Sequence, residues 1–237
     1  MSYPYLNNWQ RGLSRKGSLI FIGLFIFLFM CYEYILFSRL SAEIYYNQGL
    51  YYSEKARSAP REILFKKSLF YQDALKLFKR SLDLNPYDAR PFFECGQIIT
   101  EMADDSELRS SVDIKIIGKQ EEGFVGLYNL AKSYYEKAIS REPTNAIYHQ
   151  RLGSICDKLS DMQGAEKEFR KALLLDPQNI SIHLYLSQYF LSKDRQADFL
   201  YHLDKVVQLY KAGLRGGLLS NMVGDFLQQI NREDLIK

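Results

Sequence analysis

Hydrophobic residues follow two patterns along the chain, one continuous run near the N-terminus and then a long series at helical spacing. The run covers residues 19–37 (LIFIGLFIFLFMCYEYILF), nineteen residues with a single charge, Glu33. At about 1.5 Å per residue, a helix of this length crosses the roughly 30 Å hydrocarbon core of a bilayer. The run therefore predicts a transmembrane helix, preceded by a basic N-terminal arm at residues 1–18.

A cleaved signal peptide is the alternative for this run. The apolar core of a signal peptide has about 7 to 15 residues and ends at a site resembling A-x-A, whereas this run is longer and no such site follows it. Glu33 lies near the end of the run, between Tyr32 and Tyr34. Its side chain either reaches the membrane interface beside these tyrosines or pairs with a residue on a partner's membrane helix, so Glu33 is a candidate membrane contact.

The charges on either side of the run predict its orientation. Arg11, Arg15 and Lys16 precede it, whereas Arg39 and Glu43 cancel just after it. The positive-inside rule then places the N-terminus in the cytoplasm of a single-pass membrane protein. The rest of the chain is expected on the periplasmic or exterior side.

Composition excludes several classes of protein. The chain has 47% hydrophobic and 25% charged residues, which is ordinary for a folded protein and argues against disorder. Beyond the basic arm, basic and acidic residues balance, so no basic field for nucleic acid is expected. Three cysteines without a CxxC pair, and three histidines, form neither a disulfide scaffold nor a zinc module.

Three similar motifs divide the helical region after the run. They are Asn85-Pro86-Tyr87-Asp88, Glu142-Pro143-Thr144-Asn145 and Asp176-Pro177-Gln178-Asn179. Proline lacks the N–H that a helix interior requires, and the Asp or Asn two residues later can accept a hydrogen bond from the next helix. Each motif therefore predicts the end of one helix and the start of another.

The segment between the last two motifs resembles a tetratricopeptide repeat. Pro143 and Pro177 are 34 residues apart, and the small and aromatic positions of that repeat match Leu152-Gly153, Ala165, Phe169 and Ala172. Small residues let paired helices approach closely, and the aromatic ring fills the space beside them. The resemblance implies an all-α solenoid of helical hairpins, here following one transmembrane helix.

The same frame extends in both directions and gives four repeats over residues 42–213. Their bounds are 42–88, 89–145, 146–179 and 180–213, and the first two contain insertions between their helices, at 57–70 and 105–127. The insertions carry Ile63, Leu64, Phe65, Ile114, Ile116 and Ile117, which would pack on a neighbouring hairpin or face a partner. Residues 214–237 predict an amphipathic helix that caps the last repeat, with dimerisation as the alternative.

The resemblance also implies where a partner binds. Tetratricopeptide solenoids bind peptides or helices along the concave face made by the first helix of each repeat. Transferred to this chain, the partner-binding residues are Tyr46, Leu50, Arg90, Phe93, Gln97, Gln150, Ser154 and Lys158. Tyr46 and Phe93 are the expected aromatic anchors.

Candidate chemistry is sparse. His149 and His183 occupy equivalent repeat positions and could be imagined as a metal pair, but this position usually holds a large side chain packed between helices. Cys95 and Cys156 fall on neighbouring first helices and could form a bridge, although buried thiols are the simpler expectation. We expect no enzyme, no cofactor and no metal site.

These patterns favour a membrane-anchored adaptor or scaffold that binds a protein partner, as an accessory subunit of a larger membrane complex. Two alternatives remain open. One is a chaperone or receptor for translocating polypeptides, and the other is a structural subunit docked to a membrane enzyme through its anchor.

Overall fold

The computed structural model describes residues 15–60, 63–111, 123–212 and 217–230, and all the regular structure in these ranges is helical. Residues 1–14 of the expected basic arm lie outside them. Ten helices follow one another in the described residues: α1 (Arg15–Ser58), α2 (Leu64–Leu84), α3 (Arg90–Asp104), α4 (Ser106–Ser111), α5 (Gly123–Arg141), α6 (Ala146–Lys158), α7 (Met162–Leu175), α8 (Ile180–Ser192), α9 (Gln196–Lys211) and α10 (Gly217–Gln229).

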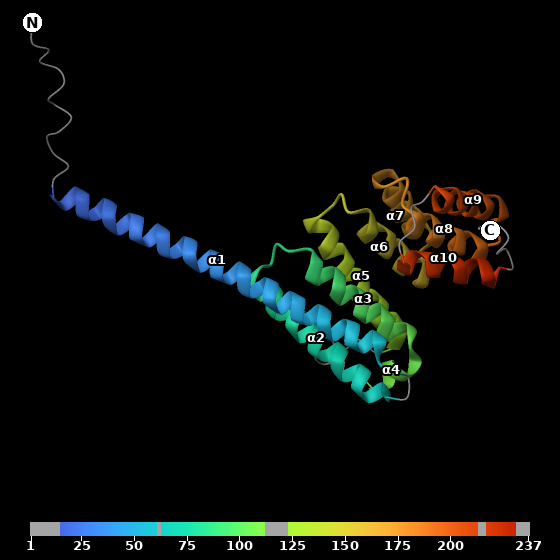
Figure 1. Cartoon of the computed structure of the whole chain (residues 1–237), viewed down its shortest axis with the longest axis horizontal. Helices are drawn as coiled ribbons and strands as arrows, with labels where there is room; N and C mark the ends of the chain where they lie inside the picture. The colour runs from blue at the N-terminus through green and yellow to red at the C-terminus, as the bar shows by residue number, and fades with distance from the viewer. Residues whose placement is uncertain (1–14, 61–62, 112–122, 213–216, 231–237) are drawn as a thin grey trace, which may run out of the picture.

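Helix α1 is 44 residues long and projects far beyond the other helices (Figure 1). Residues 20–30 are exposed on every face of the helix, whereas Ala42, Tyr46 and Gly49 further along are buried. Among the described residues, α1 is the one helix long and apolar enough to cross a membrane, with a mean hydropathy of 2.3 in its most apolar window. It is a candidate membrane span or signal sequence that continues without a break into the helical stack.

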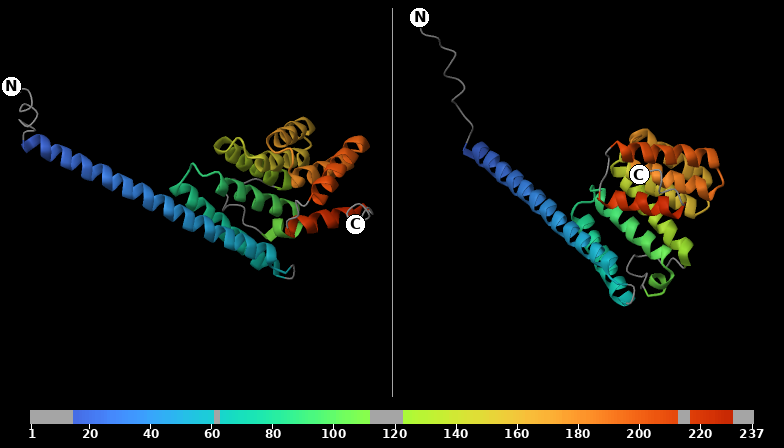
Figure 2. Two further views of the ribbon diagram at one scale, coloured as in Figure 1. Left: turned by 45° about the horizontal axis from the view of Figure 1, so that its top comes forward. Right: turned by 45° about the vertical axis from the view of Figure 1, so that its right-hand side comes forward.

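The remaining helices form an all-α solenoid of antiparallel hairpins (Figures 1 and 2). The second part of α1 pairs with α2, α3 with α5, α6 with α7, and α8 with α9. Successive hairpins touch through α2 and α3, α5 and α6, and α7 and α8. The expected fold class is confirmed.

A glycine facing an aromatic ring sets the spacing of the first three hairpins. A methyl group added at Gly153 would lie 2.8 Å from the ring of Phe169. Gly96 and Tyr135 repeat this contact at 2.8 Å, and Gly49 and Phe78 at 2.6 Å. The three rings are at most 3% exposed, so the glycines hold each pair of helices at close range.

The three proline motifs end and begin helices as predicted. The side chain of Asn145 accepts a hydrogen bond from the N–H of Ile147 at 3.2 Å, and Asn179 accepts one from Ile182 at 3.3 Å. Asp88 accepts one from the N–H of Arg90 at 3.0 Å. These bonds satisfy N–H groups that the first turn of a helix leaves free.

The insertions extend the first two hairpins. In the first, α1 continues to Ser58, α2 begins at Leu64, and the side chain of Phe65 is 76% exposed. In the second, Leu108 of α4 is fully buried against the first hairpin. Ile114, Ile116 and Ile117 lie outside the described residues.

Helix α10 packs on the fourth hairpin. Its apolar residues Val223, Phe226 and Leu227 form one cluster with Leu184 of α8 and Val206 of α9. An end repeat cannot bury its own apolar face, and this helix covers it.

Replacing Gly153 with Leu should lower the free energy of unfolding by about 1 to 3 kcal/mol, because the new side chain forces Phe169 away from α6. Chemical denaturation of the detergent-solubilised chain, followed by circular dichroism, measures the loss. Gly224→Ala is the matched control, since a methyl group there meets no atom within 4 Å. Equal stability of Gly153→Leu and the parent chain would contradict the proposed packing.

Candidate protein-binding face

Side-chain contacts join the successive first helices α1, α3, α6 and α8, and we call the side that they share the first-helix face. All the expected partner-binding residues lie on three of these helices: Tyr46 and Leu50 on α1, Arg90, Phe93 and Gln97 on α3, and Gln150, Ser154 and Lys158 on α6. Hydrogen bonds or ion pairs between side chains connect each first helix to the next.

The two expected anchors are partly absorbed into the core. Tyr46 is only 9% exposed, its ring lies 5.8 Å from that of Phe78, and the Arg90 guanidinium lies 4.5 Å above it. Burial raises the pKa of Tyr46 to about 12. Phe93 is half-buried, with its ring 4.7 Å from that of Tyr148. Both side chains therefore hold neighbouring repeats together, and Leu50 is half-buried against the same core.

A polar cluster occupies the middle of the face between α1 and α3. Arg57 donates hydrogen bonds to Glu101 at 2.9 Å and to Gln97 at 3.3 Å. The hydroxyl of Tyr71, from α2, donates to the other oxygen of Glu101. Arg57 belongs to the inserted part of α1, beyond the matched repeat positions, so the repeat frame missed it.

Glu94 lies beside this cluster, and its carboxylate is more deeply buried than that of Glu101. Its side chain is 14% exposed, and one oxygen lies 3.9 Å from the guanidinium of Arg57. Burial raises the pKa of Glu94, while Arg57 opposes the shift. Within the described residues Glu94 Oε2 makes no hydrogen bond, and neither do the buried Nε of Arg151 and Nε2 of Gln150 on α6.

Charged and polar pairs join the other first helices. Arg90 bonds to Glu43 of α1 and to Asp88, each at 2.7 Å, and these bonds raise the pKa of Arg90. Lys158 of α6 pairs with Asp104 of α3. Arg151 donates to the hydroxyl of Tyr185 on α8, and Asp157 pairs with Lys193 at 2.7 Å.

The other candidate residues differ in how deeply they are buried. Gln150 is 1% exposed and Ser154 is half-buried on the face. Glu33 lies far from the face, on the exposed apolar half of α1. Cys95 and Cys156 are free, buried thiols in separate core clusters, and burial raises the pKa of each.

His149 and His183 are packed between helices. Nε2 of each lies near the carbonyl of the preceding motif's proline, at 3.0 Å from Pro143 and 3.1 Å from Pro177. Nδ1 of His149 contacts Glu168 at 2.7 Å, whereas Nδ1 of His183 contacts Nδ1 of His202 at 2.9 Å. Across the described ranges, His, Cys, Asp and Glu form no group of three that could hold a metal ion.

Comparison with known proteins identifies the repeats. Residues 124–145 and 146–179 match the family model of the tetratricopeptide repeat. No curated protein matches the chain in sequence.

Similar solved structures include two of MamA and one of human IFIT1. The MamA structure from Desulfovibrio magneticus RS-1, starting at residue 41, is 20% identical, with 73% of this chain and 97% of that chain covered and a TM-score of 0.47. A second MamA structure is 16% identical, covering 82% of this chain and 85% of that chain, with a TM-score of 0.47. The IFIT1 dimer with PPP-AAAA is 15% identical, covering 77% of this chain and 47% of that chain, with a TM-score of 0.46.

The paired histidines predict a loss of stability in mild acid. Burial, and then the neighbouring His183, lowers the pKa of His202 to about 4. Between about pH 6.5 and pH 4 the unfolded chain therefore takes up a proton that the folded chain does not, and stability falls by on the order of 3 kcal/mol as the pH falls. Denaturation at several pH values should show a shallower fall in His202→Gln. An unchanged slope would disprove this assignment.

Proposed function

We propose that this chain, two stretches of which match the tetratricopeptide repeat, is a membrane-anchored adaptor that holds a segment of a partner protein on its first-helix face. Tetratricopeptide repeats are protein-interaction modules, and the proposed role is that of an accessory subunit in a larger membrane complex. Helix α1 is the proposed anchor.

The observation that carries this proposal is the set of buried polar atoms on the first-helix face that lack hydrogen bonds. Glu94 Oε2 lies on α3 and Arg151 Nε on α6 of the next repeat, and the charge of Arg151 acts on Glu94. A buried polar atom without a partner costs about 1 to 3 kcal/mol. Backbone and side-chain groups of a bound segment can supply the missing partners.

The charges of the face favour a basic side chain in the bound segment. Three carboxylates, Glu54, Glu94 and Glu101, meet at the centre of the face, where the charges of two cations, Arg57 and Arg151, also act. The surplus of carboxylates there attracts a lysine or arginine of the partner. Gln97 of α3 and Ser154 of α6 are half-buried on the same face and can bond to the backbone of an extended peptide.

Placement relative to the membrane follows from α1. The helix passes directly from its exposed apolar half into the first hairpin, and Ser38 donates to the carbonyl of Leu84 at 2.9 Å. The repeats would therefore begin at the bilayer surface. The basic arm before α1 supports a cytoplasmic N-terminus and repeats on the periplasmic or exterior side.

Ser154→Arg should weaken partner binding about tenfold or more, because a long charged side chain then fills the first-helix face. Ser140→Arg is the matched control, with the same substitution at an exposed site at the end of α5. Quantitative pull-down of the full chain in mild detergent measures both. Equal recovery of partners by the two variants would rule out the face as the binding site.

A cysteine at Ser140 should react with a membrane-impermeant thiol reagent in intact cells, in a chain carrying Cys95→Ala and Cys156→Ala. Ser140 is exposed, whereas those two thiols are buried. A cysteine at Ser2 should react only after lysis. The reverse pattern would place the repeats in the cytoplasm.

A further inference from the structure

The outer side of the first hairpin exposes positions that later hairpins bury. Gln48 is exposed, whereas the residues at its repeat position, Cys95, Leu152 and Leu186, are at most 7% exposed. Tyr51 is 59% exposed, and its counterparts Ile98, Ile155 and Tyr189 are at most 6% exposed. In the later repeats these side chains pack against the second helix of the preceding hairpin. Within the described residues, no hairpin precedes the first one.

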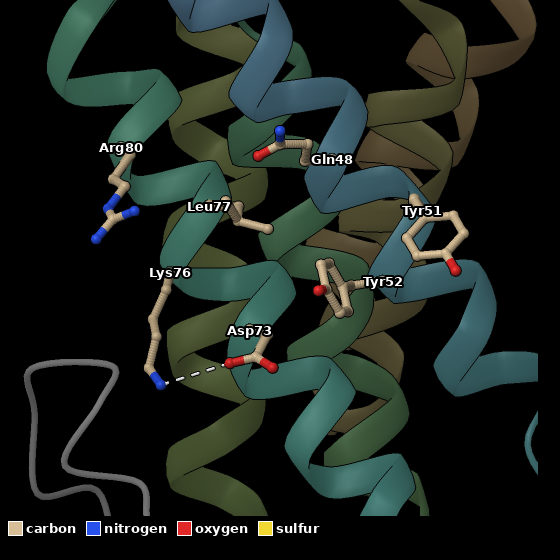
Figure 3. A pocket seen from close by; sticks show the side chains of 7 residues that line it. All are labelled: Gln48, Tyr51, Tyr52, Asp73, Lys76, Leu77 and Arg80. Atoms are coloured by element: carbon tan, nitrogen blue, oxygen red, sulfur yellow. Dashed lines mark ion pairs between the residues drawn. The ribbon is translucent and has the colours of Figure 1, made fainter.

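These positions form one wall of a groove between α1 and α2 with a volume of about 600 Å³ (Figure 3). Figure 3 shows Tyr52 pointing from α1 toward α2, with Lys76 and Arg80 on the opposite side of the groove. The full lining is Gln48, Tyr51, Tyr52, Asp73, Lys76, Leu77 and Arg80.

The fourth hairpin shows what such a groove accommodates. There the equivalents of Gln48 and Tyr52 are Leu186 and Phe190, and the equivalents of Asp73 and Leu77 are Asp198 and His202. All four of these residues line a second groove, whose other wall is α7, contributing Glu166, Phe169, Arg170 and Leu173. In the fourth hairpin, the side that carries these positions therefore lies against a helix, α7.

Details of the contact with α7 indicate how a helix is held. The ring of Phe169 lies 5.3 Å from that of Tyr189, which stands at the position of Tyr51. Glu166 of α7 pairs with Arg195 of the fourth hairpin at 2.6 Å. Helix α7 thus contributes an aromatic side chain, which packs on a ring of the fourth hairpin, and a carboxylate, which pairs with a cation of that hairpin.

The first hairpin also offers rings and cations, although its cations stand at other repeat positions than Arg195, whose place is held by Phe70. Tyr51 and Tyr52 supply the rings, while Lys76 and Arg80 supply the cations. The one carboxylate in the lining, Asp73, lies 3.6 Å from Lys76. Arg80 lies over the ring of Tyr45 at 5.8 Å and has no ion pair within the described residues. The groove is therefore basic, and a second copy of it would be repelled.

We propose that this groove binds an acidic amphipathic helix of a partner protein, which takes the place beside α1 and α2 that α7 takes beside α8 and α9. Apolar side chains of that helix pack on Tyr51 and Tyr52, and its carboxylates pair with Lys76 and Arg80. The site lies on the outer side of the first hairpin and does not involve the first-helix face, so each can be tested alone.

Photocrosslinking of the full chain in its native membrane tests this proposal. The photoreactive residue benzoylphenylalanine at position 51 should form an adduct whose crosslinked peptide is an acidic amphipathic segment of another protein. Lys76→Glu with Arg80→Glu should reduce the adduct about tenfold or more, since the charges then repel. Gln48→Arg, which fills the groove without reversing its charge, should reduce it as well. Benzoylphenylalanine at Tyr87, a tyrosine 76% exposed on a turn, is the control position and should not give this adduct.

Three results would overturn the proposal: a crosslink to a second copy of the chain, an adduct that survives both sets of substitutions, or no adduct at position 51. Circular dichroism of each variant must show unchanged helix content and melting. Crosslinking from position 154 on the first-helix face should persist in the groove variants, which separates failure here from failure of the adaptor function.

Discussion

The packing of an aromatic ring on a glycine is the contact on which the arrangement of the first three hairpins depends. In the first three hairpins the rings of Phe78, Tyr135 and Phe169 lie so close to a glycine that no side chain fits there. This contact fixes the distance between paired helices, and the distance fixes which side chains of successive first helices reach one another. In the fourth hairpin the same two places hold Ser187 and Leu203, both buried, and the serine hydroxyl bonds to its own helix at 2.7 Å. The fold tolerates this change because α10 adds a further apolar layer on that hairpin.

Local signals made much of the fold predictable from sequence. Proline, a capping Asp or Asn, and a glycine paired with an aromatic residue each act within one repeat, and each recurs at the expected place in the structure. The packing of the second insertion was not predictable from the repeat pattern. Leu108 corresponds to no repeat position, yet it is fully buried against the first hairpin. Of the candidate site, the helices that carry it were predictable, whereas the burial of its members was not. Tyr46 was expected to face a partner, yet the cation of Arg90 and the ring of Phe78 cover it.

Equivalent positions in neighbouring repeats can hold different chemistry without altering the backbone. His149 and His183 both contact a proline carbonyl through Nε2, so the loop between hairpins is tied to the first helix in the same way. The partner of Nδ1 is Glu168 in one repeat and His202 in the next. A carboxylate oxygen can only accept a hydrogen bond from the ring, whereas between two imidazoles one nitrogen donates and the other accepts. One scaffold thus carries two different contacts at equivalent positions.

The unbroken course of α1 couples the apolar half of the chain mechanically to its first hairpin. A helix transmits rotation about its own axis, and α1 contains no proline and no gap in its helical structure from Arg15 to Ser58. In a bilayer, a turn of the apolar half would swing the groove and the first-helix face through the same angle around the membrane normal. A protein that packs against the apolar half would therefore determine the direction in which both surfaces face around the membrane normal. Two glycines introduced after Ser38 would weaken the helix there, so that the apolar half could rotate without rotating the first hairpin.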